Sequence, residues 1–221
     1  MGDGSDRARS FTVAVLISGS GSNLQALLDD QQGYVVGAVI ADRVGAGGVQ
    51  RGLAGNVPTI ALPLRSPRDA AIRSTWERQL ADLIDVFAPD LIVMAGWMRV
   101  MSAAWIDRFA DRIINQHPAL LPDDRSDTYT LADGTTIPAI RGAHAVRDAL
   151  RLGVPVTGCT IHWVTPDVDV GPTLARREVP VQPGDDEATL HERIKHEERR
   201  MIVEVVQRLA RQGVNHQDAK R

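Results

Sequence analysis

"FTVAVLISGSGSNLQALLDD", from Phe11 to Asp30, joins two different patterns. Its first part is a run of β-branched and apolar residues, which predicts a buried strand over Phe11–Ile17. Its last part has the apolar spacing of a helix, over residues 22–31. Glycine and serine fill the turn between them. A strand, a glycine-rich turn and a helix in this order often bind a phosphate, because the backbone N–H groups at the helix start point at it.

The rest of the chain repeats this alternation at first. Further strands are predicted over 35–41, 59–62, 91–95 and 112–116, with helices over 49–54, 68–87 and 102–109. After Pro122 the pattern changes, and Asp133-Gly134 between Thr-rich arms predicts a solvent-exposed β-hairpin. A helix over 142–152, strands over 156–164 and 173–180, and a long helix over 186–211 follow.

This order predicts an α/β fold with a Rossmann-like, mostly parallel twisted sheet, flanked by helices and carrying an inserted β-hairpin. We expect a single domain over residues 11–211, with flexible tails at 1–10 and 212–221.

The composition limits the possible function classes. The formal net charge of the 221 residues is −3, which argues against a nucleic-acid-binding protein. One cysteine, Cys159, allows no internal disulfide. No apolar run approaches the roughly 18–20 residues that span a bilayer, and the polar N-terminus lacks a signal-peptide core. We therefore expect a cytoplasmic protein without a membrane partner. No clustered ligand spacing indicates a metal.

The glycine-rich turn allows three interpretations. Gly19-x-Gly21 matches the start of a dinucleotide fingerprint, and Asp42 stands where such folds bind ribose. Leu24, however, replaces the third glycine. A single phosphate needs only backbone N–H groups and a donor side chain, which Ser22 and Asn23 supply. A monophosphate site is favoured over a dinucleotide site and over a turn without a ligand.

Two polar residues end the strand predicted over 112–116. Asn115 and His117 are two positions apart, so they share a face at the edge where ligands bind open α/β sheets. Asparagine can stabilise an oxyanion, and histidine can transfer a proton. Polar loop residues without function are the alternative. Asp167 and Asp169 are both candidates for the carboxylate that would orient the histidine.

Glu198 lies in the middle of the apolar stripe of the last helix. A buried carboxylate is costly unless something binds it. A ligand is one explanation, and an internal ion pair with Lys195, three residues earlier, is the other. Arg73 lies near the edge of the apolar stripe of the helix predicted over 68–87.

Taken together, "LISGSGSNLQALL", "VMAGWMRVM", "NQHPALLP", "GCTIHWVTPDVDVGP" and "ERIKHEE" resemble the glycinamide ribonucleotide formyltransferase family in sequence and order. The likeness covers about Thr12 to Arg211. It implies a catalytic trio of Asn115, His117 and Asp169. If Asp169 lies beside His117, the pKa of the histidine should rise and that of the aspartate should fall. The resemblance implies that the nucleotide is bound by Gly21, Ser22, Asn23, Gly96, Lys195 and Glu198, and the folate by Arg73, Met98, Arg99, Val100, Met101, Val164 and Thr165.

The resemblance also implies the reaction. The formyl group of 10-formyltetrahydrofolate would pass to the amine of 5′-phosphoribosylglycinamide, a step of purine biosynthesis, with small-molecule substrates only and without a metal. The sequence does not decide whether the protein forms a homodimer. The alternatives are a formyltetrahydrofolate deformylase and a non-catalytic formyl-nucleotide binding protein. The deformylase has no need of a loop for a small phosphate.

The chain departs from the family in two places. Gln116 replaces a hydrophobic residue between Asn115 and His117, on the opposite face of the strand. Residues 123–141 replace a much shorter connection, and Arg141-Gly142 stands where the family has Pro-Gly. That change weakens any role carried over to His144.

Overall fold

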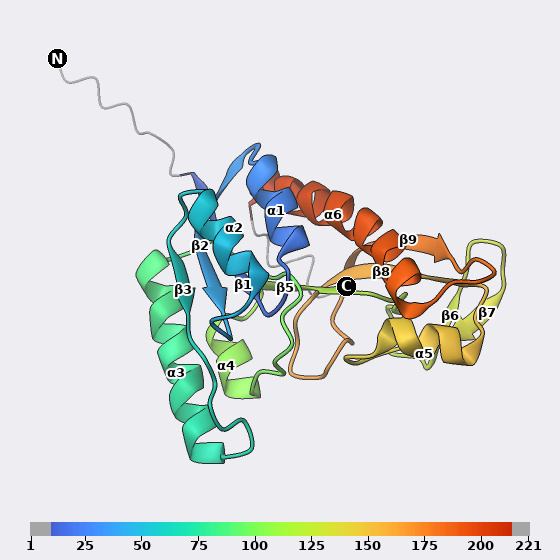
Figure 1. Ribbon diagram of the computed structural model, residues 1–221, viewed down its shortest axis with the longest axis horizontal. Coiled ribbons are helices and arrows are strands. Elements are labelled where there is room, and N and C mark those ends of the chain that lie inside the picture. The colour runs from blue at the N-terminus through green and yellow to red at the C-terminus, as the bar shows by residue number, and fades with distance from the viewer. Residues whose placement is uncertain (1–9, 214–221) are drawn as a thin grey trace.

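A seven-stranded sheet runs through the computed structural model of the protein, which describes residues 10–213 (Figure 1). Its order is β3 (Thr59–Ala61), β2 (Tyr34–Ala41), β1 (Phe11–Ile17), β4 (Leu91–Met94), β5 (Ile113–His117), β8 (Val156–Trp163) and β9 (Thr173–Pro180). The first five are parallel, and β8 and β9 are antiparallel additions. The mostly parallel, Rossmann-like sheet is confirmed.

Helices cover both faces of this sheet. On one face lie α1 (Ser22–Asp29), α2 (Gly47–Ala54) and α6 (Glu187–Gln212). On the other face lie α3 (Ala70–Phe87) and α4 (Ala103–Arg108). The alternation of β1 explains the two cores: Val13, Val15 and Ile17 pack with the first group, and Leu16 packs with the second.

The inserted hairpin, β6 (Thr128–Thr130) and β7 (Thr136–Pro138), is confirmed, but the expectation that it is solvent-exposed is wrong in part. Leu131, Ile137 and Ile140 are buried in a third hydrophobic cluster with α5 (Ala145–Leu152). A two-stranded ribbon is stable only when one face is covered. Figure 1 shows the hairpin beside α5, at the end of the molecule away from α3.

Some element ends differ from the prediction. The helix α5 begins at Ala145 rather than at residue 142, because Gly142 has a φ of +86° and is not helical. Of the predicted tails, only Ser10 and residues 212–213 fall in the described part of the chain, and Gln212 still belongs to α6. Between residues 10 and 213, no helix has the length and hydrophobicity needed to cross a bilayer.

Replacing Ile137 by alanine tests the third cluster. Ile137 is 5% exposed, so Ile137→Ala should lower the free energy of unfolding by about 2–5 kcal/mol. The matched control is Thr128→Ala on the partner strand, where the side chain is exposed and the change should stay within about 0.5 kcal/mol. Urea unfolding measures both. Equal, small changes would mean that the hairpin does not share a core with α5.

Candidate active site

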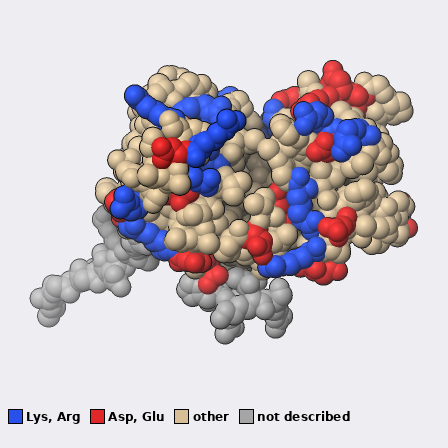
Figure 2. All heavy atoms as spheres, turned by 90° about the horizontal axis from the view of Figure 1, so that it is seen from below, with Lys and Arg blue, Asp and Glu red and all other residues tan. Residues whose placement is uncertain are grey.

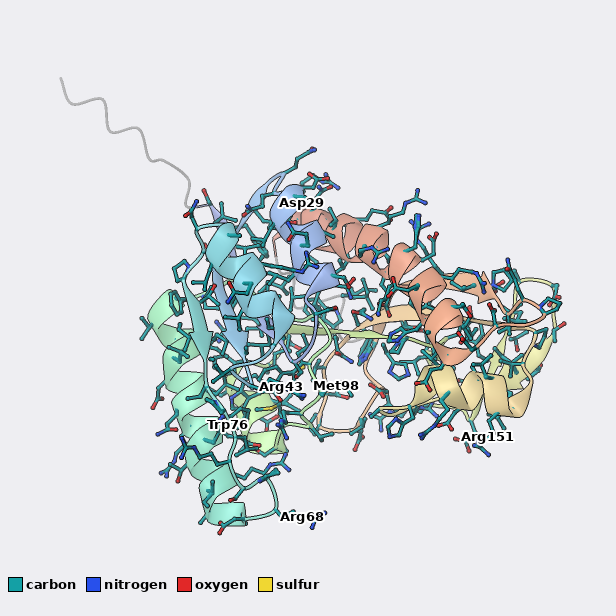
Figure 3. All side chains as sticks on the ribbon, viewed as in Figure 1. Asp29, Arg43, Arg68, Trp76, Met98 and Arg151 are labelled. Atoms are coloured by element: carbon teal, nitrogen blue, oxygen red, sulfur yellow. The ribbon has the colours of Figure 1, made fainter. Side chains whose placement is uncertain are left out.

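A cavity of about 540 Å³ opens at the carboxyl ends of β1, β4 and β5. Figure 2 shows this face hollowed, with basic side chains along the rim. The labelled Arg43 and Met98 lie on this side of the molecule, whereas Asp29 lies at the opposite end (Figure 3). Of the residues that the sequence assigned to the site, these line the cavity: Gly21, Ser22, Asn23, Gly96, Met98, Arg99, Val100, Met101, Asn115, His117, Val164, Thr165, Asp169, Lys195 and Glu198.

Arg73 does not line this cavity. Its guanidinium pairs with Glu77 one turn later on α3, with Nε 3.1 Å from Oε1, and donates from Nη2 to the carbonyl of Val100. The Glu77 carboxylate also accepts from the backbone N–H of Ser102 at 3.2 Å. Arg73 and Glu77 therefore hold the segment between β4 and α4 that forms one wall of the cavity.

The glycine loop is shaped by packing as well as by any ligand. Gly21 has a φ of +73°, and a Cβ there would lie 2.5 Å from the Cα of Gly48 on α2. The N–H of Gly48 also donates to the carbonyl of Gly19 at 3.1 Å. Gly21 is the N-cap of α1 and has no side chain to cap it, so N–H groups of the first turn can reach a ligand.

Asp42, the acid that would bind ribose in a dinucleotide site, already pairs with two arginines. Asp42 is 1% exposed, and its carboxylate accepts from Nε of Arg99 at 2.6 Å and Nε of Arg43 at 3.2 Å. Two arginines neutralise it, and Leu24 is buried in the core. This geometry favours a monophosphate over a dinucleotide.

The catalytic candidates form one network. Asn115 Nδ2 lies 3.2 Å from His162 Nε2. The other ring nitrogen, His162 Nδ1, lies 2.9 Å from the carbonyl oxygen of the next residue, Trp163. In the neutral ring this assigns the proton to Nδ1, so that Nε2 accepts from Asn115. Asp169 stands between two imidazoles, with Oδ1 3.6 Å from His162 Nε2 and Oδ2 3.4 Å from His117 Nδ1. The structure thus selects Asp169, whereas Asp167 pairs with Arg125 at the surface.

Burial sets the charges of this network. Burial alone would raise the pKa of Asp169, but His162, His117 and the N–H of Gly142 outweigh it and lower the pKa to about 2. For His117, burial is the largest influence and lowers its pKa below the ordinary value, against the attraction of Asp169 and the Ile140 carbonyl. The expected fall at the aspartate is confirmed, and the expected rise at the histidine is wrong, because desolvation exceeds the attraction of one carboxylate.

The loop backbone aims the carboxylate. Asp169 has a φ of +55°, a left-handed conformation that aspartate tolerates better than most residues. Its Oδ2 accepts from the N–H of Gly142 at 2.8 Å. A Cβ on Gly171 would lie 1.8 Å from the carbonyl oxygen of Trp163, so only glycine fits where the loop returns to β8.

A second polar group lies on the other face of β5. Asn23 Nδ2 donates to Oε1 of Gln116 and lies 3.4 Å from Oε2 of Glu198. Lys195 pairs instead with Glu192 at 2.7 Å, so the structure does not contain the internal Lys195–Glu198 pair. Burial raises the pKa of Glu198 to about 7, although Asn23 and Gln116 partly offset it. Asn23 Oδ1 and Glu198 Oε1 are buried without a hydrogen-bond partner.

Three participants were not identified from the sequence. His162, a lone histidine inside a predicted strand, was not assigned a role, although it faces Asn115 across paired strands. Gln116 was noted only as a departure from the family. The carbonyl of Ile140 lies 2.7 Å from His117 Nε2, and no side-chain pattern could have revealed a backbone contact.

Comparison with known proteins agrees with this geometry. Residues 11–206 match the model of the family described as formyl transferase. The chain belongs to the formyl transferase family. It is 40% identical over 204 residues to a phosphoribosylglycinamide formyltransferase of Mycobacterium tuberculosis, covering 91% of this chain and 86% of that protein. The corresponding Escherichia coli enzyme is 34% identical over 192 residues, covering 85% and 82%.

A solved structure agrees as well. Glycinamide ribonucleotide transformylase 1 from Symbiobacterium toebii superposes with a TM-score of 0.79 at 34% identity, covering 91% of this chain and 88% of that one. The fold and the family are therefore established together.

Alanine at Gly21 should destabilise the fold itself. The left-handed conformation and the contact with Gly48 together should cost at least about 2 kcal/mol of unfolding free energy. Gly19→Ala is the matched control, because a Cβ there meets no atom within 4 Å. Thermal unfolding of both variants checks this. An unaffected melting temperature in Gly21→Ala would show that the loop needs glycine only for a ligand.

Glu198→Gln should stabilise the protein at neutral and alkaline pH. The folded-state pKa of Glu198 is raised, so the wild type loses stability as the pH rises from about 4.5 to 7, by up to about 3 kcal/mol. Glutamine removes this loss. The variant should match the wild type near pH 4 and exceed it at pH 8 in chemical unfolding. Lower stability at pH 8 would indicate that the carboxylate is a structural anchor.

Proposed function

We propose that this protein transfers the formyl group of 10-formyltetrahydrofolate to the terminal amine of 5′-phosphoribosylglycinamide. The observation that carries the proposal is the convergence, in one cavity, of the Asn115, His117 and Asp169 network with the partnerless buried acceptors of Asn23 and Glu198. The names of the relatives point to the same reaction.

The cavity offers a distinct environment to each substrate. The N-terminus of α1, Lys195 and the glycine loop suit a phosphate. The buried acceptors suit hydroxyl or amide donors of the nucleotide. Elsewhere in the lining Met98, Val100 and Val168 remain exposed, each between 47% and 59%, which suits a flat aromatic folate ring. The substrates would therefore meet at the network on β5.

The proposed mechanism assigns each catalytic group a task. 10-Formyltetrahydrofolate supplies the formyl carbon that the amine attacks. The Asn115 amide has two N–H bonds, so one can stay on His162 while the other donates to the developing oxyanion. A pKa of about 2 makes Asp169 too weak a base for the amine, so His117 is assigned the proton of the attacking amine. His117 then gives this proton to N10 as the bond between the formyl carbon and N10 breaks and tetrahydrofolate leaves. Once protonated, His117 can donate from Nδ1 to Asp169 and from Nε2 to Ile140. No metal is needed for these steps.

Hydrolysis of the same folate is the competing activity, since the network alone could activate water. The acceptors of Asn23 and Glu198 favour the transferase, because the nucleotide offers donors for both of them, whereas a deformylase needs only water beside the folate. A spectroscopic assay for tetrahydrofolate release, run with and without the glycinamide nucleotide, separates the two. We expect release only with the nucleotide. Release without it would identify a hydrolase, and no release in either case would support a binding protein.

Variants of the network should lose turnover rather than binding. His117→Asn and Asp169→Asn should each lower kcat by on the order of 10²-fold or more, and Asn115→Ala by on the order of 10²–10³. The losses at His117 and Asp169 should not multiply in the double variant, because the two residues act as a unit. Steady-state kinetics of the four variants provides the check. Near-wild-type kcat in either single variant, or strictly multiplicative losses, would reject the pairing.

A further inference from the structure

One buried acid at the edge of the cavity has no part in the proposed reaction. Asp42 directly follows β2, and its side chain has no exposed surface. A dinucleotide-binding fold places its ribose-binding acid at this position, yet here the carboxylate faces two arginines. A buried carboxylate is costly unless it is paired and hydrogen-bonded, so its partners indicate its role.

The two arginines that pair with Asp42 are not equivalent. Arg43 is the next residue in the chain, is half exposed, and its Nε lies 3.2 Å from Oδ1. Arg99 comes from the segment between β4 and α4, and its Nε donates to Oδ2 at 2.6 Å. The shorter contact is a charge-assisted hydrogen bond, which is stronger than a neutral one. Asp42 therefore connects the end of β2 to a distant segment of the chain.

That segment, residues 96–102, forms one wall of the cavity and is held on three sides. Toward α3, Arg73 and Glu77 bind its carbonyl and N–H groups. Toward β1, the Ser18 hydroxyl accepts from a backbone N–H of the segment at 2.9 Å. Toward β2, the contact is the ion pair of Asp42. This last contact is the one that holds the middle residue of the segment by its side chain.

The direction of the middle side chain affects its two neighbours. Met98 and Val100 line the cavity and are 54% and 59% exposed, whereas the Arg99 guanidinium between them is turned to Asp42. The segment is not helical, and consecutive side chains outside a helix point in different directions. A rotation that moved the guanidinium into the cavity would therefore turn both apolar neighbours away from it.

We propose that Asp42 is a positioning residue for the folate: by holding Arg99 from the end of β2, it keeps Met98 and Val100 facing the folate ring. The inference rests on the proposed function, because it takes this wall as the one that contacts 10-formyltetrahydrofolate. It also changes the task expected of Arg99, whose guanidinium serves Asp42 instead of offering its charge to the folate. Asp42 itself touches no reacting atom.

Calorimetric binding of the product, tetrahydrofolate, tests this inference without turnover. Asp42→Asn keeps the shape of the side chain and removes its charge. It should weaken tetrahydrofolate binding by about five- to tenfold, because the wall adopts its binding conformation for a smaller fraction of the time. Binding of 5′-phosphoribosylglycinamide should stay within about twofold, since it does not use this wall. In steady-state kinetics, the KM for 10-formyltetrahydrofolate should rise while kcat stays within about threefold.

Asp90→Asn is the matched control. The Asp90 carboxylate accepts from the backbone N–H of Thr12 at 2.7 Å, but it lies just before β4, outside the cavity lining. This variant should bind both ligands as the wild type does. Asp42→Ser gives an independent reading should the asparagine variant not fold. Adding Arg99→Met to Asp42→Asn should cost less than about a further twofold in tetrahydrofolate binding, because the two residues act as a unit.

Three results would overturn the inference: unchanged tetrahydrofolate binding in a folded Asp42 variant, equal weakening of both ligands, or losses that multiply when Arg99→Met is added. Formyl transfer by the wild type is measured separately. A wild type that binds tetrahydrofolate but does not formylate the nucleotide would reject the proposed function and leave the role of Asp42 in folate binding standing. A wild type that does not bind tetrahydrofolate would reject both.

Discussion

The buried charge of Asp169 constrains the whole catalytic end of the molecule. A carboxylate that is 9% exposed is costly unless donors and positive charge surround it. The N–H of Gly142 donates to it, and two imidazoles that can donate when protonated lie beside its oxygens, His117 at 3.4 Å and His162 at 3.6 Å. These three groups come from different segments of the chain. Strands β5 and β8 must therefore pair in the register that sets Asn115 opposite His162. The loop between β8 and β9 must also turn back closely enough for Gly171 to touch Trp163.

Strand β5 contributes side chains to two different parts of the cavity. Successive side chains point to opposite faces, so one short strand serves two subsites. Asn115 and His117 face the catalytic loop, while Gln116 reaches α1 and α6. The proposed catalytic residues and the proposed nucleotide contacts are thereby separated by the thickness of one strand, and they keep a fixed relative position because β5 pairs with strands on both sides. A one-residue shift in its register would exchange the two faces and destroy both subsites.

The periodic parts of this structure could be predicted from the sequence. Alternating strand and helix patterns gave the sheet, a spacing of two gave the shared face of Asn115 and His117, and a spacing of 3.6 placed Glu198 among buried residues. These features repeat along the chain, so local patterns contain them. The resemblance to a known family added the choice of Asp169, which the spacing alone had left open against Asp167.

Contacts between distant segments were beyond the reach of these patterns. The arginine at position 73 could be placed near the edge of an apolar stripe, yet nothing local shows that it supports the Val100 carbonyl instead of lining the cavity. The glycine at position 21 was read as a ligand contact, although its approach to Gly48 depends on how α1 meets α2. The prediction that the pKa of His117 is raised was wrong for a related reason. The direction of the shift depends on how deeply the ring is buried and not on the nearest charge alone.

The insertion shows how such a distant contact reaches the chemistry. Its buried side chains, Leu131 and Ile137, give it a core shared with α5, and this core holds the Ile140 backbone in place. The Ile140 carbonyl then accepts from one nitrogen of His117 while Asp169 faces the other. A histidine held at both nitrogens has a fixed ring plane, and protonation adds a hydrogen bond instead of removing one. Packing in the hairpin thus contributes to the orientation of the His117 ring through the Ile140 carbonyl.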